Sequence, residues 1–152
     1  MITPELVIIG LIEHLLDLDA IQYTDEQHPG SAYTDDLQKP ATFIAAMDQR
    51  PTTALAISLY NEDRQRDDHN PDFYVQLRGR ALGTDPLAVE AMMQRFFQIL
   101  HWDETHPSET WPNGAEIQLS RRVSRTQALP DGKGNYERYD SYRLTVNPKM
   151  GN

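Results

Sequence analysis

The 152-residue chain contains no cysteine, and this absence excludes several kinds of chemistry. Disulfide bonds, thiolate nucleophiles and cysteine-ligated zinc are all ruled out, so the fold does not depend on an oxidising compartment. The longest apolar stretch, residues 6–18, is interrupted by Glu13, His14 and Asp17 and is shorter than the roughly 20 apolar residues of a membrane span. It also lacks the basic start and the small-residue cleavage site of a signal peptide. We therefore expect a protein made in the cytoplasm, with no membrane partner.

Basic side chains are scarce relative to acidic ones: 14 Lys and Arg stand against 23 Asp and Glu, which gives a net charge of −9. Such a protein is repelled on average by nucleic acid and by anionic membranes, which argues against non-specific binding to either. Residues 1–102 hold 7 basic and 16 acidic side chains, whereas residues 103–152 hold 7 of each. If the acidic residues share a face, that face repels DNA and allows it to pass without being held.

Motifs for catalysis and metal binding are also missing. There is no Gly-x-Ser-x-Gly, and the Gly-Lys-Gly segment at 132–134 lacks the other residues of a phosphate-binding loop. His101 and His106 are five residues apart rather than the four that place two zinc ligands on one helix face. The Asp-Asp-His segment at 67–69 lacks the ligand spacing of a calcium loop, so a solvated loop is the better interpretation. We expect no enzyme activity, no metal and no cofactor.

Two segments have the apolar spacing of helices. Thr3 can cap a helix whose first positions are Pro4 and Glu5, and apolar residues continue at helical spacing, which predicts a helix over about 3–19. A second capping segment, residues 84–86, precedes a broad apolar stripe that ends near His101. Both helices should pack an apolar surface against a sheet.

The remaining segments predict strands and loops. Alternating or continuous apolar residues predict five strands, and polar or proline-containing segments predict loops, with an Asp-Gly hairpin turn at 130–134. The expected strands cover residues 42–47, 54–60, 73–80, 116–127 and 137–146, and the expected exposed loops cover about 61–72 and 103–114. We therefore predict one α+β domain over 1–152, with a mostly antiparallel four- to five-stranded sheet and two main helices packed on one face.

Charged side chains on the expected strands and in the polar loop are the candidates for contact with other subunits or partners. Arginines of two strands could form a basic strip across neighbouring strands, which would contact phosphates or, as we prefer in so acidic a chain, acidic residues of a neighbouring subunit. The candidate interface residues are Arg64, Arg66, Asp67, Asp68, Arg78, Arg80, Arg121, Arg122 and Arg125.

Several segments together resemble the tail-terminator family of long-tailed bacteriophages, also called tail-completion or minor capsid proteins. The strand at 75–80 (Val-Gln-Leu-Arg-Gly-Arg) and the capped helix that ends at Leu100 and His101 resemble that family's strand with an Arg-Gly pair and its helix that closes near Leu-His. Residues 130–138, followed by the aromatic strand at 142–146, resemble the family's last turn and strand. Residues 43–47 and 54–60 resemble the two strands, separated by a proline-containing turn, that follow its first helix.

The resemblance covers about residues 3–147 and implies a structural role in the virion, at the junction between tail and head. Members of this family assemble as a ring, typically a hexamer, that caps the finished tail tube and presents a surface to the head connector. The implied partners are other copies of the chain, the tail tube protein and a head-completion or connector protein, with DNA passing through the lumen without specific binding. The loops at 61–72 and 103–114 are the expected contacts with tube or connector. Two alternatives stay open: another head–tail neck or head-completion protein, and a small nucleic-acid-binding module.

Overall fold

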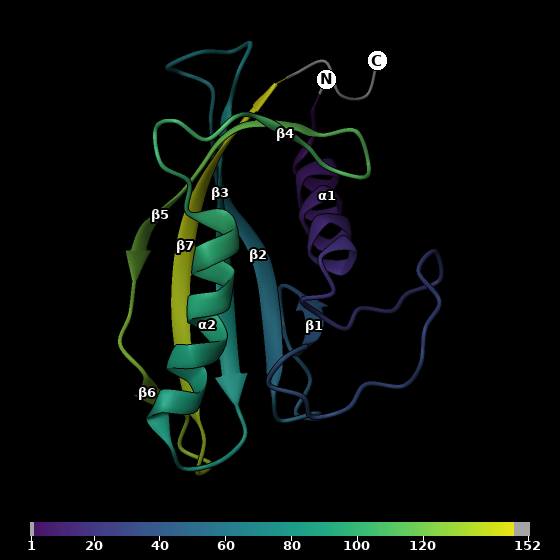
Figure 1. Cartoon of the computed structure of the whole chain (residues 1–152), viewed down its shortest axis with the longest axis vertical. Helices are drawn as coiled ribbons and strands as arrows, with labels where there is room; N and C mark the ends of the chain where they lie inside the picture. The colour runs from purple at the N-terminus through teal and green to yellow at the C-terminus, as the bar shows by residue number, and fades with distance from the viewer. Residues whose placement is uncertain (1, 148–152) are drawn as a thin grey trace.

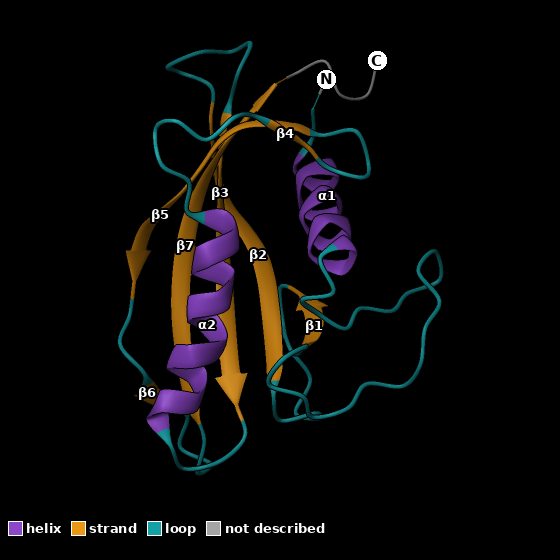
Figure 2. Cartoon of the chain, viewed as in Figure 1, coloured by secondary structure: helices purple, strands orange, loops and turns teal. Residues whose placement is uncertain are grey.

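The computed structural model describes residues 2–147, which form an α+β domain with two helices and a curled sheet (Figures 1 and 2). The predicted fold class is therefore confirmed. The elements in chain order are α1 (Pro4–Asp17), β1 (Ala41–Ile44), β2 (Ala54–Asp63), β3 (Asp72–Ala81), α2 (Pro86–Leu100), β4 (Glu109–Thr110), β5 (Glu116–Arg125), β6 (Leu129–Pro130) and β7 (Tyr136–Asn147).

Both helices begin where a capping side chain precedes a proline. The Thr3 hydroxyl accepts a hydrogen bond from the Leu6 amide at 3.4 Å, and the Asp85 carboxylate accepts one from the Leu87 amide at 2.9 Å. Each bond satisfies one of the amides that have no partner inside the first helical turn. Both helices lie within two residues of their predicted boundaries, and His101 caps the C-terminal end of α2.

The sheet is larger than predicted and is not wholly antiparallel. Seven strands pair in the order β1-β2-β3-β7-β5-β4, with β6 alongside β7. The four- to five-strand expectation omitted the two-residue strands β4 and β6, which are too short to produce a sequence pattern. β1 and β2 are parallel, because residues 45–53 carry the chain back to the end of the sheet at which β1 starts. The remaining pairs are antiparallel.

The core lies between the helices and one face of the sheet (Figure 1). Alternate residues of β3, from Phe73 to Ala81, point into it together with residues of both helices. Gly79 allows the closest approach: a Cβ at this position would lie 2.4 Å from the sulfur of Met93 and 2.8 Å from the terminal methyl of Met92. The glycine of the Arg-Gly-Arg segment therefore permits α2 to pack directly onto β3.

Both predicted loops are shorter than expected. β2 continues to Asp63 and β3 begins at Asp72, so the loop between them covers residues 64–71 rather than 61–72. The ladder continues because Glu62 and Asp63 pair with β3, although this part of the hairpin buries little apolar surface. The segment 103–114 contains β4, and its Trp111 is only 1% exposed, so it is only partly an exposed loop. Within residues 2–147, neither helix is long and apolar enough to cross a bilayer.

Candidate functional site

The two candidate arginines on β3 point away from the helices, and both bind within the chain. Arg78 forms a two-pronged ion pair with Glu137 of β7, with Nε to Oε2 at 3.0 Å and Nη2 to Oε1 at 2.9 Å. Its hydrogen bonds to this carboxylate raise the pKa of Arg78. Arg80 is 9% exposed and donates to main-chain carbonyls of the segment between β1 and β2. The acceptors are the carbonyls of Thr52 and Asp48 at 2.7 Å, Pro51 at 3.2 Å and Gln49 at 3.3 Å.

The three candidate arginines on β5 also have partners in the same chain. Arg121 donates to the Trp102 carbonyl at 2.7 Å, and Arg125 reaches both carboxylate oxygens of Glu90 at 2.9 and 2.7 Å. Arg122 lies 3.4 Å from an oxygen of Asp140, and its guanidinium carbon is 4.1 Å from the centre of the Phe97 ring.

The predicted basic strip across neighbouring strands does not form. β7 lies between β3 and β5, so the two groups of arginines are not on adjacent strands. Arg122 and Arg125 are opposite Tyr142 and Asp140, which share the helix-covered face of the sheet, whereas Arg78 is on the other face. The sequence did not predict this arrangement, because insertion of the last strand between two earlier ones is a long-range feature.

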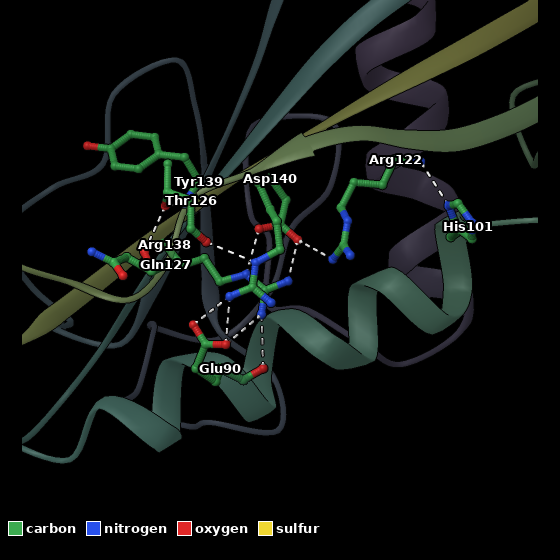
Figure 3. A network of polar contacts seen from close by, with 9 residues as sticks. Glu90, His101, Arg122, Thr126, Gln127, Arg138, Tyr139 and Asp140 are labelled. Carbon is green, nitrogen blue, oxygen red and sulfur yellow. Dashed lines mark hydrogen bonds and ion pairs between the residues drawn. The ribbon is translucent and has the colours of Figure 1, made fainter.

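A buried ion pair beneath α2 is the main polar feature that sequence reasoning missed (Figure 3). Arg138 and Asp140 of β7 have side chains 1% and 0% exposed, and two bonds of 2.7 Å join the guanidinium to the carboxylate. Arg138 also lies 3.4 Å from the carbonyl and from a carboxylate oxygen of Glu90 on α2. The pair therefore connects the sheet to α2, and through Arg122 it also connects β7 to β5. One feature of the sequence could have revealed the pair. Side chains alternate between the two faces of a strand, so Arg138 and Asp140 lie on the same face of β7 as the buried Tyr142.

His101 connects the end of α2 to β5. Its Nδ1 accepts the Arg122 amide at 3.1 Å, and its ring stacks on Phe97 with centroids 4.6 Å apart. Burial, followed by the positive charges of Arg121 and Arg122, lowers the pKa of His101. The neutral ring is the form that can accept this bond, so His101 is an acceptor in the fold. His106 instead stacks on the Trp102 ring, with centroids 4.1 Å apart.

The loop at the end of the β2–β3 hairpin is held by its own charged residues. Arg66 reaches both oxygens of the buried Asp72 at 3.1 and 3.2 Å and donates to the Asn70 carbonyl at 2.9 Å. Asp72 is fixed from the other side by the Thr145 hydroxyl at 2.6 Å.

The other three candidates in this hairpin lie around the same loop. Arg64 bonds to Glu62 and to the main-chain carbonyl of Ile2 at 3.1 Å, which attaches the loop to the start of α1. Asp67 accepts hydrogen bonds from Asn70 and from the His69 amide, and these lower its pKa. The Asp68 side chain is 79% exposed and lies 3.8 Å from Arg64. The structure therefore brings these four candidates together in one ordered loop.

The segment 103–114 docks against α1 through its second half. The Trp111 ring stacks on His14 with centroids 5.0 Å apart, and the Asn113 amide donates to the Leu6 carbonyl at 2.8 Å. Burial lowers the pKa of His14, although the nearby Glu109 and Asp17 act in the opposite direction. Before the docked tryptophan, residues 103–105, 107 and 108 are exposed, and exposed residues also occur at 110, 112 and 114.

The two acidic clusters lie on different segments of the fold. Asp35 and Asp36 belong to the long connection between α1 and β1, whereas Asp67 and Asp68 belong to the hairpin loop at the opposite end of Figure 1. Over residues 2–147 there is no group of three histidine, aspartate or glutamate side chains placed to hold a metal ion. The described polar residues are thus arranged as intramolecular pairs and as an exposed hairpin loop.

Comparison with known proteins adds no assignment to this geometry. No protein-family description matches the chain, and no curated protein matches its sequence.

Proposed function

We propose that the chain is a structural virion protein that caps the tail tube as a ring, with six copies as the expected number, and forms the surface to which the head connector joins. The sequence resemblance supplies this proposal. In this role the protein catalyses no reaction and uses no cofactor. DNA crosses the lumen without specific contacts, which agrees with a net charge of −9.

The structural observation that best supports the proposal is the projecting β2–β3 hairpin. Its loop, residues 64–71, extends beyond the N-terminal end of α1 (Figure 1). The loop is exposed, yet Arg66 and Asp72 fix its conformation. A surface ordered before binding loses less conformational freedom when a partner docks, which is an advantage for a small protein that must recognise a large assembly. We assign this hairpin loop, with the mostly exposed residues 103–109, to contact with tube or connector.

The test is to shorten the hairpin without disturbing the sheet. Residues 67–70 are replaced by a two-residue Asn-Gly turn, so that Arg66 stays to pair with the buried Asp72. The variant is compared with a matched control in which Lys133→Ser alters the separate turn at 131–135. The hairpin variant should remain folded by circular dichroism but fail to complete tails in an infection or in vitro assembly assay, whereas the control should complete them. Full tail completion by the shortened protein contradicts the assignment of the loop.

The same assay separates the tail-terminator proposal from a neck or head-completion role. A tail terminator binds the open end of tubes assembled from the tail tube protein of the same virus. A head-completion protein binds the connector and leaves the tube end free. Binding to connector alone would therefore replace the proposal with that alternative.

A further inference from the structure

Most of the outer edge of the sheet is covered, and two stretches are not. The edge of β1 is closed by the Gln22 carbonyl, which accepts the Thr42 amide at 2.8 Å, and by the Tyr33 hydroxyl, which donates to the Thr42 carbonyl at 2.9 Å. β4 covers the start of β5, and the Trp102 amide donates to Ser120 at 2.9 Å. In the part of the chain that the structure describes, the outer edges of residues 58–63 of β2 and of residues 121–125 of β5 have no strand partner. On the β5 edge the Arg122 amide already donates to the His101 side chain, so the main-chain groups left for a partner strand are those of the other residues.

The two open stretches lie at the same level along the strand direction, at opposite edges of the sheet. The register across the strands shows this. Arg121 of β5 is opposite Arg143 of β7. Arg143 is in turn opposite Tyr74 of β3, and Tyr74 is opposite Asn61 of β2. Three antiparallel pairings separate β2 from β5, so the two strands run in opposite directions. A neighbouring copy rotated about an axis along the strands keeps its strand direction. Its β2 would therefore meet β5 of the first copy in antiparallel orientation, the geometry of an ordinary sheet.

The two edges carry charges of opposite sign, and each edge has one exposed apolar side chain. The β2 edge carries Glu62 and Asp63, and the β5 edge carries three arginines. These groups have partners within their own chain, but the side chains of Glu62 and Arg125 remain 34% and 35% exposed and can still face a neighbouring copy. Pairing two identical edges would place like charges opposite each other, whereas pairing β2 with β5 places opposite charges together. Each stretch also has an irregularity in its register next to an exposed apolar side chain, Tyr60 at 53% exposed on β2 and Val123 at 47% on β5.

We infer that copies of this chain associate head to tail, with residues 58–63 of β2 in one copy adding as a strand to residues 121–125 of β5 in the next. This inference rests on the proposed ring and specifies its subunit contact. The contact is heterologous, so repetition by rotation closes a ring rather than stopping at a dimer. Main-chain hydrogen bonds supply the affinity and the charges select the pairing. Charged and irregular edges also protect monomeric proteins from aggregation, and the experiment distinguishes the two roles.

The absence of cysteine makes a cross-linking test clean. Tyr60→Cys and Val123→Cys are introduced together into the full chain, and the protein is oxidised at micromolar concentration. Within one copy the two positions are separated by three strand spacings, roughly 14 Å, which is too far for a disulfide. Every disulfide must therefore join two copies. Without reductant we expect a ladder that runs from dimer up to the closed ring. Addition of reductant should return all of it to monomer.

Three comparisons decide the outcome. Each single cysteine variant should stay mainly monomeric, and a mixture of the two should stop at a dimer. A Leu87→Cys/Val123→Cys control, whose first position is 70% exposed on α2, should give no ladder. Equal ladders from the control, dimers from the single variants alone, or monomer only from the Tyr60/Val123 pair would each overturn the inference.

A second variant tests the contact without a covalent bond. Val123→Glu places an acidic side chain opposite the acidic β2 edge and should weaken self-association at least tenfold by mass measurement, while Leu87→Glu should not. Adding Tyr60→Lys to Val123→Glu should restore association. A ladder from protein that does not bind tubes would retain this inference and reject the proposed function. If the protein caps tubes but gives no ladder, the proposed function is retained and this inference is rejected.

Discussion

The buried Arg138–Asp140 pair gives the sharpest stability prediction. Asp140 is fully buried and accepts two bonds of 2.7 Å from Arg138, and a third group, Arg122, lies at 3.4 Å. Asp140→Ala leaves the Arg138 guanidinium 1% exposed, with only the longer 3.4 Å contacts to Glu90. Removing one partner of a buried pair typically costs about 3–5 kcal/mol, which is a large part of the stability of an ordinary domain.

The assay is urea unfolding monitored by circular dichroism, with the melting temperature as a second readout. A loss of about 3–5 kcal/mol corresponds to a decrease in Tm of roughly 6–20 °C for a chain of this size. Asp68→Ala is the matched control, because this carboxylate is 79% exposed and its removal should change the unfolding free energy by less than about 0.5 kcal/mol. The double variant Arg138→Met/Asp140→Leu should recover most of the loss, because it removes both charges. A cost below about 1 kcal/mol for Asp140→Ala would refute the reasoning that an unpaired charge is left buried.

Three further predictions follow from individual contacts. Because the pKa of His101 is lowered in the folded state, its contribution to stability is present above pH 6.5 and is lost as the pH falls through the folded pKa. His101→Asn should therefore reduce the loss of unfolding free energy between pH 6.5 and 5, by at most about 1.4 kcal/mol per pH unit, as measured by urea titration. Trp111→Ala should cost about 3–5 kcal/mol and expose residues 103–114 to limited proteolysis, and unchanged protease resistance would contradict its role in docking the segment. Gly79→Val should lower the unfolding free energy by about 1–3 kcal/mol, because its side chain would overlap Met93, whereas a stability gain would show that α2 accommodates it.

Local sequence signals predicted the helices and the longer strands well. Thr3 and Asp85 act through caps within three residues, and the alternation from Phe73 to Leu77 reports directly which residues of β3 are buried. Such features depend on a few neighbouring residues, so they can be recognised without knowledge of the fold.

Features that depend on distant segments were not predicted. The parallel pairing of β1 with β2 requires the return path at 45–53, and the position of β7 between β3 and β5 requires knowledge of the whole sheet. The arginines illustrate the consequence. Arg78 and Arg125 were predicted to lie in one strip, but Glu137 and Glu90 bind them on opposite faces of the sheet. The partner of a long charged side chain is set by topology, which the sequence pattern alone does not reveal.

For the β2–β3 hairpin loop, the sequence predicted the position but not the internal contacts. The polar composition of residues 61–72 predicted an exposed loop, and residues 64–71 are indeed a loop. The pattern did not show that Asp72 is buried or that it pairs with Arg66, because its other partner, Thr145, is far away in the sequence and is brought opposite Asp72 only by the pairing of β3 with β7. The composition of this segment thus predicted that it is exposed, whereas the contacts that fix its conformation depend on the fold.

The most direct test of the central claim is electron microscopy of tubes assembled from the tail tube protein of the same virus and mixed with this chain, with the bound mass counted in parallel. We predict a six-fold ring at one end of each tube and a halt in tube growth. Tubes that keep growing with both ends bare, at chain concentrations well above those of tube ends, would contradict the account.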